Sequence, residues 1–178
     1  MNLANKLTVF RVVLVPFFVV FILTDFTQYN RWIAFAIFCI ATITDKLDGT
    51  IAKKYNMTTN FGKFMDPIAD KLLVSSALIC LCSLGEIPAW IIVIIIAREF
   101  VISGIRLVAS DNGVTIAASW WGKLKTISQM TMIIIMLLNI EKLTLLCDIV
   151  MYISLALTLI SMVDYIIKNK KVLVLNTK

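Results

Sequence analysis

Long apolar runs, separated by short polar stretches, recur along the whole 178-residue chain. Each run approaches the roughly 20 mostly apolar residues that a helix needs to cross a bilayer. Six spans can be drawn from this pattern, with approximate ends: 6–24, 32–53, 61–84, 88–109, 120–139 and 143–167. The pattern therefore predicts an all-α integral membrane protein with six transmembrane helices, in which residues 1–178 form a single domain.

Polar and turn-forming residues mark the connections between these runs. Residues 24–30 are polar, residues 85–88 form a tight connection, and residues 111–113 have the turn sequence Asp-Asn-Gly. Of the 17 Lys and Arg residues, only Arg31 and Lys142 lie at the loops of one side. Because basic residues gather on the cytoplasmic side, we expect both termini in the cytoplasm.

Composition agrees with a membrane protein. Hydrophobic residues make up 60% of the chain, charged residues only 16%, and the mean hydropathy is +0.93, whereas soluble domains carry about 25% charged residues. The first run contains Arg11 and Pro16 and lacks a small-residue cleavage site, so we expect it to be retained as a helix. The short chain without a transit peptide favours a bacterial plasma membrane.

Charge and cysteine usage exclude several classes of function. The net charge is +6, but the basic residues flank apolar runs and form no single basic stripe. Membrane lipids or an anionic substrate are therefore the expected partners, and nucleic acid is not. The four cysteines lie inside apolar runs without ligand spacing, so we expect neither disulfides, nor zinc, nor redox chemistry.

One acidic pattern stands out at the predicted cytoplasmic edge of the second and third spans. It comprises Asp45, Asp48, Gly49 and Ala52, then Gly62, Asp66 and Asp70. Spacings of three and four place each of the two sets on one helix face. The small residues leave room for a neighbouring helix or a ligand to approach closely. If the two faces meet, four carboxylates converge.

Four carboxylates at a membrane edge would repel one another, so bound divalent cations are the simplest compensation. The chain has no histidine, which argues against zinc and favours Mg²⁺ or Mn²⁺ on oxygen ligands. Two such ions, held by the four aspartates, would also neutralise a diphosphate. Without histidine, the general base must be a carboxylate, a lysine or a tyrosine, and Asp70 is the candidate. The alternative, solvated caps and loop charges, is disfavoured because four of 11 acidic residues share this one spacing.

This pattern resembles the signature of the CDP-alcohol phosphotransferases, D-x-x-D-G-x-x-A-R followed after a short spacer by G-x-x-x-D-x-x-x-D. Every position matches except one, where the family arginine is Lys53, which replaces a two-pronged guanidinium by a point charge. Residues 5–11, 60–67, 98–107 and 122–126 further resemble bacterial members of the family that use glycerol 3-phosphate.

The resemblance implies a homodimer of six-helix subunits, with an active site that faces the cytoplasm and donor acyl chains in the bilayer. The implied reaction transfers the phosphatidyl group of CDP-diacylglycerol to the 1-hydroxyl of glycerol 3-phosphate and releases CMP. By the same resemblance, Asp45, Asp48 and Asp66 hold the metals, and Asp70 is both ligand and base. The positions implied to contact CDP-diacylglycerol are Asn5, Thr8, Gly49, Ala52, Lys53, Thr59 and Gly62.

An acceptor such as glycerol 3-phosphate needs guanidinium or ammonium groups near the metals. The candidates are Arg98, Arg106, Lys123 and Lys125. An arginine inside an apolar run is costly and therefore a functional hypothesis, although Arg98 could instead snorkel or pair with Glu99. For the two lysines, the alternative is a role in membrane topology.

Two other functions stay open. The first is a family relative with another acceptor, namely serine, inositol phosphate or phosphatidylglycerol, and charge alone does not exclude inositol phosphate. The second is a small cation or proton transporter. Transporter ion sites tend to lie near the bilayer midplane between repeated halves. The position of the aspartates at one edge and the lack of an internal repeat argue against it.

Overall fold

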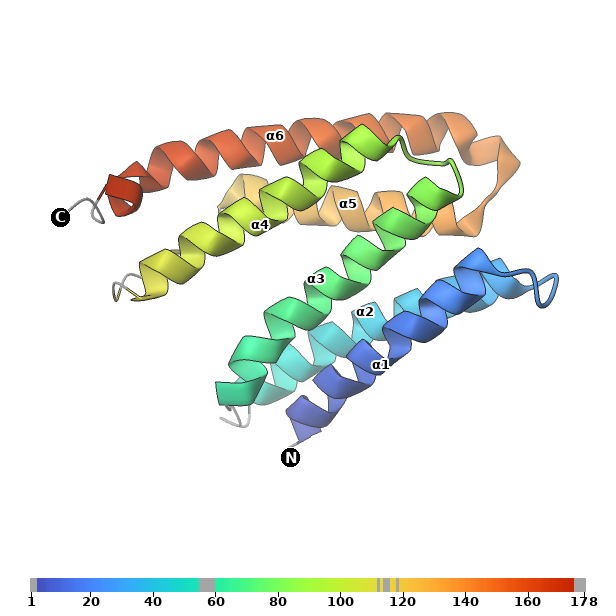
Figure 1. Ribbon diagram of the computed structural model, residues 1–178, viewed down its shortest axis with the longest axis horizontal. Coiled ribbons are helices and arrows are strands. Elements are labelled where there is room, and N and C mark those ends of the chain that lie inside the picture. The colour runs from blue at the N-terminus through green and yellow to red at the C-terminus, as the bar shows by residue number, and fades with distance from the viewer. Residues whose placement is uncertain (1–2, 55–59, 112, 114–115, 118, 175–178) are drawn as a thin grey trace. The chain divides into compact units, whose positions relative to one another are not determined.

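The computed structural model describes the backbone of residues 3–54, 60–111, 113, 116–117 and 119–174. It describes the side chains of residues 6–45, 65, 68–110, 113, 116–117 and 119–170. Within these ranges the regular elements are helices, and no strand forms (Figure 1). The prediction of an all-α chain is confirmed.

In the part of the chain that the structure describes, six long helices follow the six predicted apolar runs. Their boundaries differ from the predicted ones by only a few residues, except at the end of the last helix. They are α1 (Leu3–Leu23), α2 (Asn30–Lys54), α3 (Asn60–Ser83), α4 (Ala89–Asp111), α5 (Trp120–Leu138) and α6 (Thr144–Val174), with a short 3-10 helix η1 (Glu141–Leu143) before α6.

Two stretches of the described chain, Lys6–Leu23 and Glu141–Lys170, are long and apolar enough to cross a membrane by length and composition. The sequence of α4 is interrupted by the charged residues Arg98, Glu99 and Arg106. Charges of this kind must face protein or water when a helix spans a bilayer. The count of six spans and the side of the termini stay predictions.

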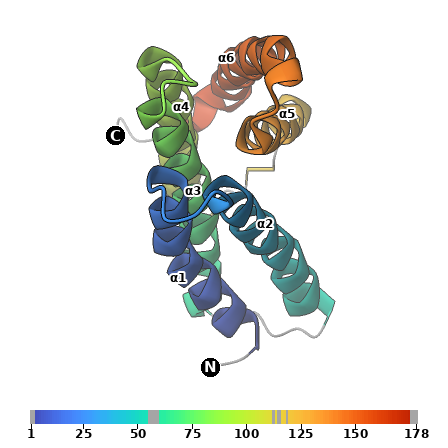
Figure 2. The same ribbon diagram turned by 90° about the vertical axis from the view of Figure 1, so that its right-hand side faces the viewer.

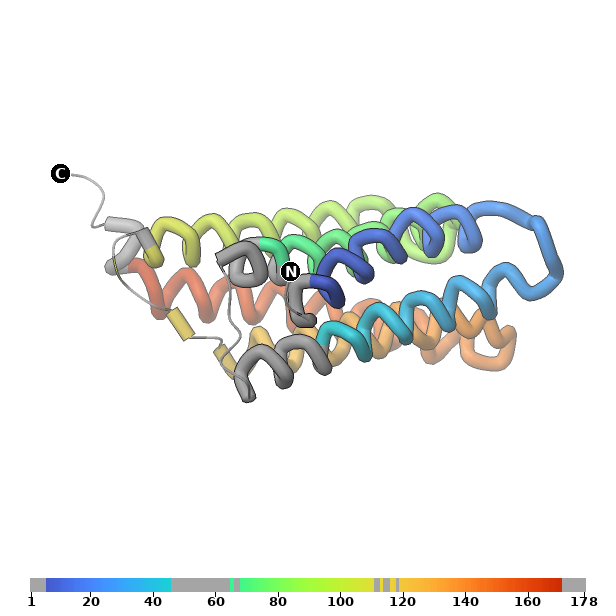
Figure 3. The backbone as a smooth tube through the Cα atoms, turned by 90° about the horizontal axis from the view of Figure 1, so that it is seen from below, coloured from blue at the N-terminus to red at the C-terminus, as the bar shows by residue number. Residues whose placement is uncertain are grey.

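The chain divides into two compact units, one of Met1–Glu86 with Met136–Asn139 and the other of Ile87–Ile135 with Ile140–Lys178. In the first unit, α1 packs against both α2 and α3 (Figure 2). In the second unit, α4 packs along α6, and the two helices run in the same direction (Figures 1 and 3). Whether the chain acts as one catalytic domain stays a prediction.

One face of α1 forms the centre of the first unit. Its buried residues are Thr8, Arg11, Val15, Phe18 and Ile22, which alternate spacings of three and four. Phe18 is fully buried, and its ring lies 5.9 Å from that of Phe38 in α2. The face is therefore apolar along most of its length and polar only at its first two turns.

The predicted tight connection after α3 is confirmed. Gly85 has a φ of +77°, and its N–H donates to the carbonyl of Cys82 at 2.9 Å. The N–H of Glu86 reaches back to the carbonyl of Leu81 at 3.0 Å. This pair of bonds ends a helix with a left-handed residue, a conformation that glycine adopts without strain.

Arg31, at the start of α2, contacts two other segments of the first unit, namely the connection after α3 and the end of α5. Its Nη2 lies 2.5 Å from Glu86 Oε1 and 2.7 Å from the carbonyl of Met136. Its Nε donates to the carbonyl of Leu137 at 3.3 Å. Because the last carbonyls of α5 lack partners within the helix, Arg31 caps that end.

The second unit shows an inverted distribution of polarity along α6. Among the described residues, the buried positions of this helix include Ser154, Thr158 and Ser161, all 0% exposed, together with Met151, Leu155 and Tyr165. Its exposed large apolar side chains include Leu145, Ile149, Ile153, Ile160, Val163 and Ile167. Hydroxyls inside and aliphatic groups outside suit a hydrocarbon environment and disfavour an aqueous one. The exposed side of α6 is thus apolar, as is typical of a helix that faces lipid.

Candidate active site

Asp45, the first aspartate of the acidic pattern, contacts an arginine from another helix. Arg11 Nη1 of α1 lies 2.5 Å from Asp45 Oδ1 of α2, across 34 residues of sequence. The arginine side chain is 0% exposed, whereas that of the aspartate is 37% exposed. Thr8, one turn earlier on α1, is also fully buried. The acidic edge of the first unit therefore already contains one buried cation, oriented by its bond to Asp45.

Sequence reasoning did not assign a role to Arg11 at this site. It registered the residue within the first apolar run and within the family resemblance only. The available signal was the one applied to Arg98: an arginine inside an apolar run of membrane length is expensive unless it has a partner. The identity of that partner depends on how α1 and α2 face each other.

Asp70 lies on α3, which contacts α2 in the same unit, and its side chain is half-buried. Asp48 lies on α2 and Asp66 on α3, but their side chains lie outside the described residues. Only the backbone is described at several positions predicted to contact the nucleotide: Asn5, Gly49, Ala52, Lys53 and Gly62. Thr59 lies wholly outside the described residues. The meeting of four carboxylates therefore stays a prediction.

The donor chemistry of this edge fits a hard divalent cation. Among the side chains that the structure describes, no three His, Cys, Asp or Glu groups gather as a metal site, and this set includes neither Asp48 nor Asp66. The two described members of the pattern, Asp45 and Asp70, are carboxylates in partly accessible positions. Partly hydrated carboxylate sites are those in which Mg²⁺ is usually bound.

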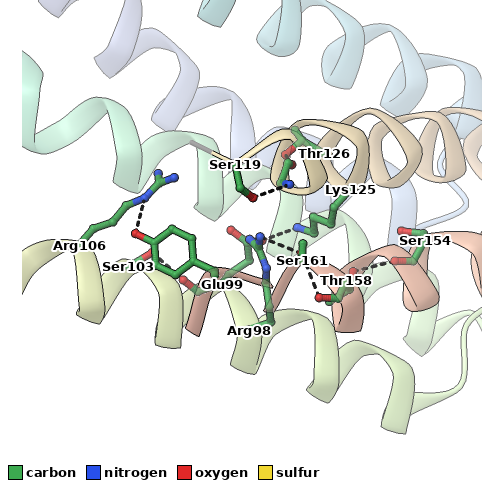
Figure 4. Close-up of polar contacts among 12 residues, drawn as sticks. Arg98, Glu99, Ser103, Arg106, Ser119, Lys125, Thr126, Ser154, Thr158 and Ser161 are labelled. Carbon is green, nitrogen blue, oxygen red and sulfur yellow. Dashed lines mark hydrogen bonds and ion pairs between the residues drawn. The ribbon is translucent and has the colours of Figure 1, made fainter. Parts of the chain in front are cut away.

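In the second unit, two buried cations share one carboxylate oxygen (Figure 4). Arg98 Nη1 of α4 donates to Glu99 Oε1 at 3.0 Å, and Lys125 Nζ of α5 donates to the same oxygen. Arg98 is 7% exposed and Lys125 is 3% exposed. Arg98, Glu99 and Lys125 are called here the cationic cluster, and the charges of these three side chains sum to one positive charge.

A hydroxyl of α6 also binds the guanidinium of Arg98. Arg98 Nη2 donates to Ser161 Oγ at 3.0 Å, and that hydroxyl donates to the carbonyl of Thr158 at 3.0 Å. Since the Ser161 hydroxyl donates its hydrogen to the carbonyl of Thr158, its oxygen accepts the hydrogen bond from the guanidinium. Arg98 Nε is buried and has no acceptor in the described part of the chain.

The first turn of α5 passes close to this guanidinium. Ser119 Oγ caps the helix by accepting from the N–H of Gly122 at 3.1 Å. A Cβ on Gly122 would lie 3.3 Å from Ser119 Oγ and 3.6 Å from Arg98 Nη2. A side chain at Gly122 would thus press on the capping hydroxyl by a few tenths of an ångström and would lie in contact with the guanidinium.

The other two predicted acceptor residues do not join the cationic cluster. Arg106 is exposed, donates from Nε to Tyr165 Oη at 3.2 Å and lies 5.6 Å from the centroid of that ring. Lys123 is exposed, and a residue two positions from Lys125 points to another side of the helix. The structure thus brings together two of the four candidates, Arg98 and Lys125.

Glu99 is the member of the cluster that sequence reasoning did not place in the site. The pairing of Arg98 with Glu99, considered as an alternative to a binding role, does form. It includes Lys125 as well, a residue 26 positions away. A glutamate inside an apolar run is as informative as an arginine there, because both need compensation.

Comparison with known proteins gives a consistent result. The sequence model described as CDP-alcohol phosphatidyltransferase matches residues 1–160. The chain is 40% identical to the CDP-diacylglycerol–glycerol-3-phosphate 3-phosphatidyltransferase of Bacillus subtilis strain 168, over 94% of this chain and 95% of the relative. It is 44% identical to the probable phosphatidylglycerophosphate synthase of Mycobacterium tuberculosis strain H37Rv, over 93% of this chain and 80% of the relative. A Haemophilus influenzae protein with the same name as the Bacillus relative is 39% identical over 93% of this chain and 91% of its own length.

Proposed function

Because this chain belongs to the CDP-alcohol phosphatidyltransferase family, we propose that it transfers the phosphatidyl group of CDP-diacylglycerol to glycerol 3-phosphate and releases CMP. It is thus an enzyme of phosphatidylglycerol biosynthesis. The observation that carries this function is the identity of 39–44%, over at least 93% of the chain, to relatives named for this reaction or its product.

The acidic edge of the first unit is the proposed reaction centre. Asp45, Asp48, Asp66 and Asp70 are the proposed ligands of two Mg²⁺ or Mn²⁺ ions. Such ions, when bound, offset the negative charge of a diphosphate. Arg11 fixes the orientation of the Asp45 carboxylate, because its guanidinium is itself buried and cannot turn towards solvent.

Asp70 is the proposed general base. Its carboxylate accepts the proton of the acceptor's 1-hydroxyl as that oxygen attacks the phosphorus of the donor. With no histidine in the chain, a carboxylate at this edge is the best-suited group. The polar first turns of α1, with Asn5 and Thr8, are proposed to contact the cytidine diphosphate of the donor. The remaining proposed contacts are Gly49, Ala52, Lys53, Thr59 and Gly62.

The cationic cluster of the second unit is the proposed binding site for the phosphate group of the acceptor. Arg98 and Lys125 are buried, carry charge in excess of Glu99 and present donors to a single point. A phosphate monoester offers several acceptor oxygens and a double negative charge, which matches this set of donors. Arg106 and Lys123, both exposed, are proposed to attract the acceptor from solvent.

The proposed arrangement in the membrane is a multi-pass homodimer with six spans per subunit and an active site open to the cytoplasm. The proposed spans are supported by the exposed apolar side chains of α6 and by the correspondence between six apolar runs and six helices in the described part of the chain. The homodimer is proposed from the family resemblance alone. The whole chain is proposed to act as a single catalytic domain. The distribution of Lys and Arg supports cytoplasmic termini.

The decisive experiment measures CMP release by the purified protein in detergent or bilayer mimetic. CDP-diacylglycerol is supplied with Mg²⁺ or Mn²⁺ and with one acceptor at a time: glycerol 3-phosphate, inositol phosphate, serine or phosphatidylglycerol. We expect release with glycerol 3-phosphate. Release with inositol phosphate but not with glycerol 3-phosphate would overturn the proposed function.

A second arm tests the metal. Treatment with EDTA should abolish CMP release, and added Mg²⁺ or Mn²⁺ should restore it. Undiminished release in excess EDTA would contradict the metal assignment. It would leave the identity of the acceptor unaffected.

A further inference from the structure

The cationic cluster contains a geometric constraint beyond the presence of two cations. The nitrogens of Arg98 and Lys125 both bond to Glu99 Oε1, so they lie no further apart than two hydrogen bonds placed end to end. The two cations come from different helices, α4 and α5. Two buried like charges at this separation repel each other strongly without an intervening anion.

We propose that Glu99 is a positioning residue that holds Arg98 and Lys125 at the spacing at which both can bind one phosphate group of the acceptor. This inference rests on the proposed function, since it concerns an acceptor that carries a phosphate. Glu99 belongs to no predicted set of site residues, and its carboxylate acts through the two cations.

The surroundings of Glu99 support a positioning role over simple neutralisation. A single carboxylate leaves one positive charge in excess, and it leaves Arg98 Nε buried without an acceptor among the described residues. The carboxylate therefore brings the two cations together, and the guanidinium of Arg98 can still donate through its Nε to a second, larger anion.

The exposure of the three side chains is consistent with this division. The side chain of Glu99 is 23% exposed, whereas those of Arg98 and Lys125 are 8% and 4% exposed. The anchored end of the guanidinium is bonded to Ser161 on α6, so an entering anion would meet donors that are already placed. Preorganised donors lose little entropy on binding, which favours affinity for the acceptor.

The test is Glu99→Gln, which keeps the size and one carbonyl oxygen but removes the charge. We expect the KM for glycerol 3-phosphate to rise by about tenfold, because charge-assisted hydrogen bonds to the two cations are weakened. The kcat and the KM for CDP-diacylglycerol should change little, as expected when ground-state binding alone is reduced. Glu99→Asp keeps the charge and should recover part of the loss.

Glu86→Gln is the matched control. Glu86 also pairs with an arginine, Arg31, and its side chain is 26% exposed, close to the value for Glu99. It belongs to the first unit, whereas the cationic cluster belongs to the second. This variant should lower the melting temperature at most and leave both KM values unchanged. A fall in melting temperature for Glu99→Gln with both KM values unchanged would reduce Glu99 to a structural role and overturn the proposal.

A binding measurement separates this inference from the proposed function. Inorganic phosphate should raise the melting temperature of the wild-type protein, and the increase should be smaller for Glu99→Gln. If the wild type releases CMP with inositol phosphate only, the choice of acceptor is wrong, but a reduced phosphate effect in the variant still supports the role of Glu99. An equal phosphate effect in both proteins would overturn that role whatever the acceptor is.

Discussion

In each of the two units of the chain, a buried charged side chain contacts a side chain of the opposite charge, but the signs are reversed between the units. In the first unit, a buried arginine on α1 contacts Asp45, one of the four aspartates that are predicted to converge. In the second unit, one glutamate on α4 contacts two buried cations. Each unit thus holds a buried pairing of opposite charges, within a predicted acidic group in the first unit and within the cationic cluster in the second.

The difference between the units lies in the ligand that each group can take. A mainly acidic group with one arginine keeps affinity for cations, and a mainly basic group with one glutamate keeps affinity for anions. The single opposite charge makes it possible to bury each group of charges. Burying the same charges without any opposite charge would cost too much free energy in a membrane protein. Removing the single opposite charge should therefore affect each unit in its own way.

The largest effect is expected for Asp70→Asn in the acidic group. Loss of the proposed base should lower turnover by about a hundredfold or more, because general base catalysis contributes this much. Binding of CDP-diacylglycerol should persist, since the amide keeps the size of the carboxyl group. CMP release at saturating substrate concentrations measures the turnover. Protection from thermal unfolding by CDP-diacylglycerol measures the binding of the donor. Near-normal turnover would remove Asp70 as the base.

Arg11→Gln should have the next largest effect, on the compensating charge of the same unit. The fully buried guanidinium would be lost from Asp45, at a cost of about 1–3 kcal/mol in the free energy of unfolding. The Mg²⁺ concentration for half-maximal CMP release should also rise, because the carboxylate is no longer oriented.

Arg31→Gln provides the control for that variant. Arg31 also pairs with an acid in the first unit, but it caps α5 and does not contact the acidic pattern through any described bond. The Arg31→Gln variant should have a lower melting temperature, and the dependence of its CMP release on Mg²⁺ concentration should be unchanged. An unchanged Mg²⁺ dependence in Arg11→Gln as well would show that Arg11 is a structural residue only.

Ser161→Ala should have a moderate effect on the basic group. The change removes the 3.0 Å acceptor of Arg98 Nη2, so the KM for glycerol 3-phosphate should rise by about fivefold. Ser154→Ala is the matched control, because Ser154 Oγ is buried on the same face of α6 and has no partner among the described residues. It should leave kinetics unchanged. Equal KM values in the two variants would contradict the role assigned to Ser161.

The smallest effect is expected for Lys53→Arg, which restores the family residue. A guanidinium in place of the ammonium keeps the charge and adds donors, so CMP release should stay within about twofold of the wild type. A collapse of activity would show that lysine has a role of its own at this position. Steady-state kinetics with varied CDP-diacylglycerol provide the measurement.

The acidic pattern and the helices were accessible to sequence reasoning because both are local. A helix of apolar residues is recognisable from its composition, and same-face spacing within one helix follows from 3.6 residues per turn. The turn at Gly85 was recognisable for the same reason, since its bonds join residues within one helical end.

Pairings between helices were not accessible in this way. Sequence spacing is silent on which face of α1 meets α2, so the partner of Arg11 could not be named. The sequence suggested Arg98, Arg106, Lys123 and Lys125 as candidates, with Arg98 favoured and the two lysines least favoured. The packing of α4, α5 and α6 separates them into two buried cations and two exposed ones.

The sequence by itself determined that this protein is helical and apolar and which four aspartates share its signature, because each of these properties depends on residues within one or two helical stretches. Only the tertiary structure decided that Arg11 compensates Asp45, and that Glu99 joins Arg98 to Lys125. The physical reason is that a buried charge needs a partner, while the choice of partner depends on how each helix is rotated against its neighbours.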